Sequence, residues 1–304
     1  MKKIVIAFLI LSVLNVVIFY FRDAFAYVPV ATHETLYENH TDKNLNKWIR
    51  FSEDYPAEEE TEAKQISSNW FDEKDVTTLD SVLKIANKIH NNFNKQTDRP
   101  SLFLELQSPL NKYKTLLKDS TEKLWCGTYS QIFNFFCLSN NILSRYIEII
   151  NPGDHHVLNE SYLPDRKKWV MIDVTFNINA PKNDKNQLLN LIEFASELRN
   201  NSLPLKYPYT HLDTVTKKHH EILNYYIPDR PYYYHFYIDN RVAYKFENKL
   251  ARYLFPVSWY TIFTYAPVSN YMFGIKIALF YLWVASGLIL LYITLYNDRN
   301  KRLE

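Results

Sequence analysis

Three residues far apart along the chain have side chains that together could cleave or transfer an acyl group. Cys126 offers a thiol nucleophile, His156 an imidazole base, and Asp173 a carboxylate that can orient the imidazole. A helix is expected to begin at or just after Cys126, and the unpaired N–H groups at a helix start favour the thiolate over the thiol. These residue types therefore predict attack of the sulfur on an amide or ester carbonyl.

The few glycines mark two positions beside these residues. The chain has only 4 glycines, and two of them, Gly127 and Gly153, lie next to the cysteine and to a pair of histidines. Glycine permits positive φ or the close approach of another backbone, so we expect unusual backbone demands at both positions. Trp125, Gly127 and His155 are candidate substrate-binding residues, although Trp125 could simply pack and His155 could simply lie at the surface.

The residues that lead up to the cysteine are expected to be helical. Apolar residues at i, i+3 and i+4 spacing predict an amphipathic helix over 79–93, after a Thr-Thr-Leu-Asp start signal. A second helix is expected over 110–117. The third should run from Cys126 to Asn140 and Asn141, a pair able to adopt the left-handed stop that glycine usually provides.

Beyond this helix the apolar period changes from 3.6 to 2, which predicts strands. The expected strands are 145–150, 156–163 and 169–176, with a further helix over 188–198 and an aromatic strand over 232–238. A hairpin centred between Pro164 and Asp165 would place His156 directly across from Asp173 on one face. Helices followed by strands indicate an α+β domain.

Both ends of the chain are expected to be membrane segments. The apolar run 4–21 could be an anchor, although Ala-Phe-Ala at 24–26 also fits a cleaved signal peptide. The run 271–296 is expected to be a transmembrane helix. Basic residues near both termini would place both tails in the cytoplasm by the positive-inside rule, and the residues between them outside, in a periplasm or a lumen.

The composition excludes several other classes of protein. With 35 Lys and Arg against 33 Asp and Glu, the net charge is +2, so the chain lacks the excess of basic residues that is typical of nucleic-acid-binding proteins. Only Cys126 and Cys137 are present, which excludes a disulfide scaffold and an all-cysteine metal site, and Cys137 is expected in the core. His219 and His220 are adjacent, which suits one metal site poorly. We therefore expect no metal and no other cofactor.

Three ordered blocks resemble the transglutaminase-like core of the papain-like thiol enzymes. They are Leu124–Ser130 with its Trp-Cys-Gly, His156–Tyr162, and Trp169–Thr175 with its Trp-x-x-x-Asp-x-Thr pattern. The resemblance spans roughly residues 78–180. It implies a cysteine-bearing helix packed on an antiparallel sheet, with Cys126 as nucleophile, His156 as base and Asp173 as orienting acid.

The resemblance has three departures. Leu158 replaces the tryptophan that usually follows the histidine, Val174 replaces the common proline after the acid, and Asn140-Asn141 stands where the family often has glycine. The triad survives these changes, but the shape of the substrate groove does not follow from the family.

The sequence thus predicts a membrane-anchored, extracytoplasmic thiol enzyme. Its substrate would be a peptide or a cell-envelope polymer, with hydrolysis favoured over transfer to an amine. The alternatives are an inactive scaffold of an envelope or export assembly that uses the same fold, and a subunit of a polymer-synthesis machine. The predicted segments are 1–22, anchor or signal peptide; 23–77, linker or extension; 78–180, the core; 181–265, an aromatic-rich membrane-proximal extension; 271–296, transmembrane helix; and 297–304, cytoplasmic tail.

Overall fold

The structure is a computed structural model with two compact units. One unit holds the two terminal helices and the other holds a mixed domain of helices and sheet, and each is described by itself. The residues described are 2–20, 32–38, 40–45, 56–71, 77–151, 154–199, 225–226, 233–237, 250, 261–265 and 271–301.

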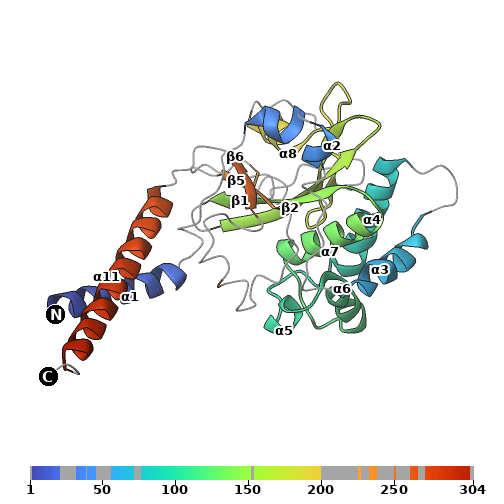
Figure 1. The fold of residues 1–304 in the computed structure, drawn as a ribbon. Coiled ribbons are helices and arrows are strands. Elements are labelled where there is room, and N and C mark those ends of the chain that lie inside the picture. Colours follow the sequence, from blue (N-terminus) through green and yellow to red (C-terminus); the bar gives the residue numbers. More distant parts are fainter. Residues whose placement is uncertain are drawn as a thin grey trace. The chain divides into compact units, whose positions relative to one another are not determined.

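A six-stranded antiparallel sheet forms the centre of the mixed domain (Figure 1). The strand order is β4-β3-β2-β1-β5-β6. The strands are β1 Ser144–Asn151, β2 Asp154–Leu163, β3 Lys168–Asp173, β4 Ile178–Asn179, β5 Tyr233–Tyr237 and β6 Thr261–Tyr265. The combination of helices with an antiparallel sheet confirms the expected α+β class, and β5 confirms the aromatic strand.

Helices from the first half of the chain cover one face of this sheet, on the opposite side from α8 (Figure 1). They are α3 Glu58–Ser68, α4 Thr78–Phe93, α5 Leu102–Glu105, α6 Pro109–Lys118 and α7 Cys126–Ser139. The starts of α4 and α6 are capped by Thr77 and Ser108, whose side chains accept backbone N–H groups, and Pro109 fits the first turn of α6. The predicted amphipathic helices are therefore confirmed.

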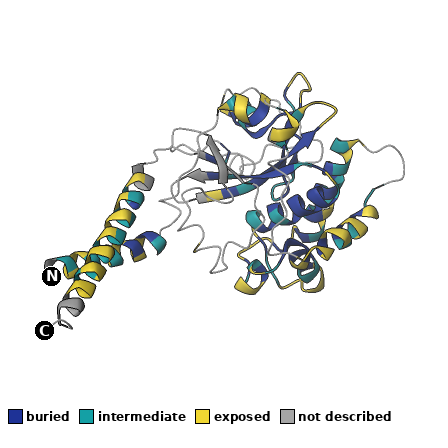
Figure 2. Ribbon diagram, in the orientation of Figure 1, coloured by how far each residue is buried: buried dark blue, intermediate teal, exposed yellow. Residues whose placement is uncertain are grey.

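The central helix of this layer is α7. Its residues Ile132, Phe133 and Phe136 are fully buried (Figure 2). Together with apolar residues of α4 and α6, they form one core that packs against β3. Asn141 follows the helix with φ 59°, so the predicted left-handed stop is confirmed. The helix therefore begins at Cys126 and is fixed at its other end by an asparagine.

The opposite face of the sheet carries a second, aromatic core. It is covered by η1 Glu34–Glu38 and by α8 Leu191–Arg199, which begins three residues later than expected, and α2 Asp42–Leu45 follows η1 along the chain. The residues of this core include Trp169, Phe194 and Tyr226, each at most 1% exposed. Part of the predicted linker 23–77 is thus helical, because η1, α2 and α3 all lie within it.

A buried ion pair joins the two central strands on this second face. Arg145 of β1 and Glu160 of β2 stand opposite each other, and Arg145 Nη2 lies 2.6 Å from Glu160 Oε2 with both side chains fully buried. The guanidinium also lies 4.0 Å from the centroid of the Trp169 ring. Glu160 Oε1 accepts hydrogen bonds from the Tyr37 hydroxyl and the Leu191 N–H. One carboxylate therefore ties β2 to β1, η1 and the start of α8.

The register of the β2–β3 hairpin differs from the prediction by two residues. Leu163 pairs with Lys168 and Asn159 with Ile172, so the hairpin is centred between residues 165 and 166. The four-residue loop 164–167 ends with Lys167 at φ 47°, a conformation that a lysine does not signal. The prediction of a direct cross-strand pair is wrong. A shift of two residues preserves the face, however, because side chains alternate with a period of two.

β3 is also shorter than the predicted strand 169–176. It ends at Asp173, because Asp173 Oδ1 accepts a hydrogen bond from the Phe176 N–H at 3.0 Å and turns the chain. The turn continues through Asn177, which adopts φ 55°. The carboxylate that could orient a histidine therefore also ends its own strand.

The other unit contains two long apolar helices, α1 Lys2–Tyr20 and α11 Tyr271–Lys301. In the described part of the chain, one helix is long and apolar enough to cross a membrane, Gly274–Tyr296 within α11. The apolar part of α1, Ile4–Phe19, is shorter. The two helices contact each other: Trp283 Nε1 donates to Ser12 Oγ at 2.8 Å, and the Phe8 and Trp283 rings stack at 5.9 Å.

Candidate functional site

The thiol of Cys126 lies at the first residue of α7, with Trp125 as the residue that precedes the helix. Cys126 is partly exposed, whereas the following turns of the helix are buried. Backbone N–H groups in this first turn have no carbonyl partners within the helix, so they favour negative charge near the sulfur. The location agrees with the predicted position of a nucleophile.

Gly127 has neither a positive φ nor another segment's backbone close to it, so the expectation of an unusual backbone demand is wrong at this position. A Cβ at this position would lie 3.6 Å from Trp125 Nε1, which is an ordinary contact. A methyl group at this position would therefore contact the indole without a clash, and the glycine relieves no backbone strain. Gly153 lies outside the described residues.

His156 and Asp173 are in direct contact, although they are not opposite each other in the sheet. His156 Nε2 lies 2.6 Å from Asp173 Oδ2, and both side chains are at most 4% exposed. Asp173 is the last residue of β3, and His156 is the third residue of β2. Side chains two positions apart on neighbouring strands can still touch, so the diagonal arrangement brings the two groups together.

The Cys126 side chain lies near enough to the His156 ring to contribute to the raised pKa of His156. Because Nε2 faces Asp173, Nδ1 is the ring nitrogen left for a partner other than Asp173. Burial by itself would lower the pKa of His156, but the negative charge of Asp173 and the hydrogen bonds to Asp173 and Cys126 outweigh it and raise the pKa. At neutral pH the imidazole therefore holds its proton.

Asp173 is fixed by several donors besides His156. Its Oδ1 accepts the Phe176 N–H, and its Oδ2 also accepts the hydroxyl of Tyr226 at 2.5 Å. One residue further along, the Val174 carbonyl accepts a hydrogen bond from the His90 ring on α4 at 2.8 Å. The carboxylate is thus buried with its oxygens satisfied, and its turn is tied to the helical layer.

Aromatic rings surround the His156 imidazole. Phe176 stacks on it at 4.8 Å between ring centroids, Tyr225 lies at 5.6 Å, and Tyr226 presents an edge at 5.8 Å. These rings exclude water from the His156–Asp173 contact, which strengthens it electrostatically. Sequence reasoning missed all three: in a chain with 24 tyrosines, nothing distinguishes Tyr225 and Tyr226, and Phe176 was predicted as part of a strand.

Of the predicted substrate-binding residues, Trp125 lies beside the thiol and His155 does not. Trp125 is 38% exposed and borders the thiol, as a groove residue would. His155 is exposed and lies 3.4 Å from Glu148 of β1. It points to the opposite face of β2 from His156, so the sheet separates it from the His156–Asp173 contact.

A buried polar cluster joins the first turns of α7 to α5 and α6. Thr128 Oγ1 donates to Glu105 Oε1 at 2.7 Å, and Lys112 Nζ donates to Gln131 Oε1 at 2.6 Å. Lys112 is 2% exposed and lies 3.7 Å from Glu105, and burial lowers its pKa. This cluster links α5 and α6 to the turns that follow the thiol.

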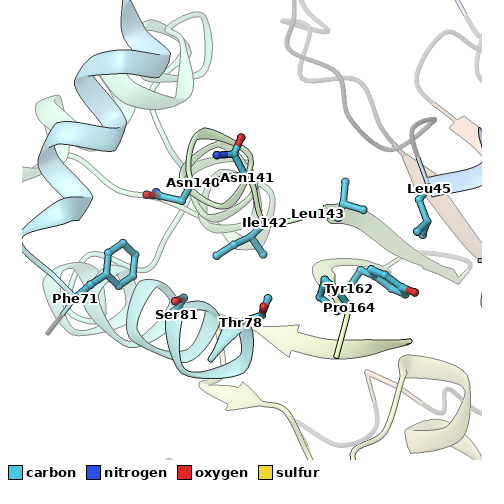
Figure 3. A pocket seen from close by; sticks show the side chains of 10 residues that line it. All are labelled: Leu45, Phe71, Thr78, Ser81, Asn140, Asn141, Ile142, Leu143, Tyr162 and Pro164. Carbon is cyan, nitrogen blue, oxygen red and sulfur yellow. The ribbon is translucent and has the colours of Figure 1, made fainter. Parts of the chain in front are cut away.

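A cavity of about 430 Å³ lies at the far end of α7 (Figure 3). It is lined by Leu45, Phe71, Thr78, Ser81, Asn140, Asn141, Ile142, Leu143, Tyr162 and Pro164. The helix has 14 residues, which corresponds to about 20 Å between its ends. This cavity is therefore separate from the Cys126 thiol.

The second cysteine serves as an internal comparison. Cys137 lies on the same helix, is fully buried and forms no disulfide, so its prediction as a core residue is confirmed. Burial raises the pKa of its thiol. The helix therefore carries one accessible thiol beside a histidine and one inaccessible thiol in the core.

Comparison with known proteins gives little further information. No protein-family model matches the chain, and no curated protein matches it. Among solved structures it is similar to a protein from Cytophaga hutchinsonii described as a putative cysteine protease, with 18% identity and a TM-score of 0.34. The similarity covers 45% of this chain and 43% of that protein, so the chain spans less than half of its length.

Proposed function

We propose that this chain is a thiol hydrolase of the transglutaminase-like kind, which cleaves amide bonds through an acyl-enzyme on Cys126. The observation that carries the proposal is the 2.6 Å contact between His156 Nε2 and the buried Asp173 carboxylate, with the Cys126 thiol near enough to contribute to the raised pKa of His156. This is the arrangement that nucleophilic catalysis by a thiol needs, with a base next to the nucleophile and a third group that orients the base.

The proposed reaction follows from these positions. The Cys126 sulfur attacks the carbonyl carbon, the C–N bond breaks, and His156 gives its Nδ1 proton to the departing amine. Water then attacks the thioester, His156 takes a proton from it, and the C–S bond breaks to release the carboxylic acid. Asp173 holds the ring by Nε2 throughout and stabilises its charged form.

The partly exposed positions around the thiol support a peptide or an envelope polymer as the substrate. Cys126 and Gly127 are reachable from solvent, and Trp125 offers an exposed ring beside them. An indole ring can pack against the side chains or the sugar rings of an extended polymer. The indole Nε1 of Trp125 would lie 3.6 Å from a Cβ at Gly127.

We further propose that α1 stays in the mature protein and crosses the membrane with α11. The contacts of Ser12 and Phe8 with Trp283 support this, as does the 3.2 Å distance between the Phe8 ring and a Cβ built at Gly287. Basic residues at both termini favour cytoplasmic tails, and the mixed domain would then lie outside, close to membrane-anchored substrates.

The test of the catalytic proposal is the rate at which each thiol of the full-length chain reacts with iodoacetamide. Cys126 should react at least about 100-fold faster than Cys137, because burial shields the Cys137 thiol and each unit of raised pKa reduces its thiolate tenfold. His156→Ala should slow the labelling of Cys126 at neutral pH, because the thiolate loses its neighbouring imidazolium.

His155→Ala is the matched control, because His155 is the adjacent histidine but lies exposed on the other face of β2. It should leave the labelling of Cys126 unchanged. Equal labelling of Cys126 in the unaltered chain and in His156→Ala would rule out the proposed mechanism.

A further inference from the structure

Tyr226 contacts the candidate acid from a segment that lies 53 residues beyond it in the chain. Its hydroxyl donates to Asp173 Oδ2 at 2.5 Å, the same oxygen that faces His156 Nε2 at 2.6 Å. This oxygen therefore has two donors, one on the histidine and one on the tyrosine. The segment belongs neither to β2 nor to β3, so no strand pairing requires this contact.

The Tyr226 side chain is held in this position by its surroundings. It is 0% exposed, and its ring meets Phe194 of α8 edge to face at 5.2 Å. The Tyr234 hydroxyl donates to the Tyr226 carbonyl at 3.4 Å, which links the segment to β5. The ring centroid of the neighbouring Tyr225 lies 5.4 Å from that of Phe176. The hydroxyl of Tyr226 is thus aimed at the carboxylate by packing from two elements.

Sharing one oxygen between two donors has a chemical consequence. A hydrogen bond from a neutral hydroxyl stabilises the ionised carboxylate and withdraws part of its charge. The carboxylate then attracts the proton of the imidazolium less strongly than it would with His156 alone. With Oδ1 occupied by the Phe176 N–H, the carboxylate also cannot rotate to offer its other oxygen.

We propose that Tyr226 is a positioning residue of the site: its hydroxyl fixes the Asp173 carboxylate and limits how strongly that carboxylate retains the proton on His156. This inference rests on the proposed function, because it assigns Tyr226 a role through Asp173 and His156 and not through contact with substrate. A proton held too tightly would be transferred slowly to the leaving amine, so the hydroxyl would favour the acylation step.

The titratable groups that face the imidazole in the described part of the chain come from three elements. They are Asp173 at the end of β3, Cys126 at the start of α7, and Tyr225 with Tyr226 after α8. Tyr226→Phe removes one hydroxyl from this set and keeps the ring that packs against Phe194. A change in the proton affinity of His156 would therefore report on the Tyr226 hydrogen bond.

The experiment is the pH dependence of Cys126 alkylation by iodoacetamide in the full-length chain and in Tyr226→Phe. The upper inflection of this profile reports loss of the His156 proton, because the thiolate reacts differently beside a neutral ring. In Tyr226→Phe this inflection should move to higher pH by about one unit, a tenfold change in proton affinity. Tyr113→Phe is the matched control: it removes another buried hydroxyl, one bonded to the neutral amide of Asn92, and should not move the inflection.

Circular dichroism on heating shows whether Tyr226→Phe folds. If it does not, a chain with 4-aminophenylalanine at position 226 replaces it, because the amine is a weaker donor and should move the inflection upward by a smaller amount. An inflection that stays in place or moves to lower pH would overturn the role of Tyr226. Equal labelling rates of Cys126 in the unaltered chain and in His156→Ala would instead refute the proposed function.

Discussion

The buried pair of Arg145 and Glu160 allows a quantitative prediction about stability. Glu160→Gln removes the charge that faces the guanidinium but retains an amide oxygen that can accept from Tyr37 and Leu191. What remains is a fully buried cation with no carboxylate, and breaking such a pair costs about 3–5 kcal/mol. Since domains are stable by about 5–15 kcal/mol, this single change should remove a large part of the free energy of unfolding.

The reasoning can be checked with a double-mutant cycle. Arg145→Met alone should also destabilise strongly, because it leaves the carboxylate buried and removes the contact with the Trp169 ring. The double variant Arg145→Met with Glu160→Gln carries neither charge. It should therefore be less destabilised than the sum of the two single variants by about 2 kcal/mol or more.

The assay is urea unfolding of the full-length chain in detergent, followed by far-UV circular dichroism. Arg166→Met is the control, because the Arg166–Asp165 pair is about half exposed at 3.5 Å and should contribute at most about 1 kcal/mol. Additive effects of Arg145→Met and Glu160→Gln, within about 0.5 kcal/mol, would refute the idea that the two charges stabilise each other.

Two further predictions concern pH and topology. The folded-state pKa of His156 lies above its usual value of about 6.5, so the associated stability is fully present below that pH and is lost as the pH rises through the folded value. The free energy of unfolding measured in urea should therefore decline as the pH rises above about 6.5. Asp173→Asn removes the main cause of the raised pKa, so the free energy of unfolding of this variant should depend less on pH. An equally steep decline in the variant would contradict the assignment of the decline to His156 and Asp173. If α1 is retained, a tag placed at the N-terminus should stay on the mature chain and be protected from protease added outside the cell, together with a C-terminal tag. Loss of the N-terminal tag on export would instead indicate cleavage.

Much of the helical layer could be predicted from the sequence, because its signals are local. The start of α4 at Thr77, the apolar spacing within it and the Asn141 stop are each recognisable from a few neighbouring residues. The start of α7 at Cys126 was also predicted, although Trp125 before it provides no side-chain cap. These features depend on backbone hydrogen bonds within one element, and distant residues do not override them.

The parts that the sequence left undetermined either lack a recognisable residue signal or depend on residues far apart. The register of the β2–β3 hairpin follows from Lys167 in a left-handed conformation, which its residue type does not indicate. Asp173 ends β3 through its own side chain, and a period-two pattern does not reveal this. The hydrogen bond from Tyr226 joins residues that no local pattern connects, so only the folded chain identifies it.

The position of Tyr226 also sets when the site can be completed during synthesis. The thiol, the imidazole and the carboxylate have all been translated once residue 173 is made, but the hydroxyl that shares the carboxylate oxygen follows 53 residues later. A nascent chain that is still emerging therefore lacks one of the donors that hold its acid in place. The full set of hydrogen bonds at Asp173 can therefore form only after the chain has been translated past residue 226.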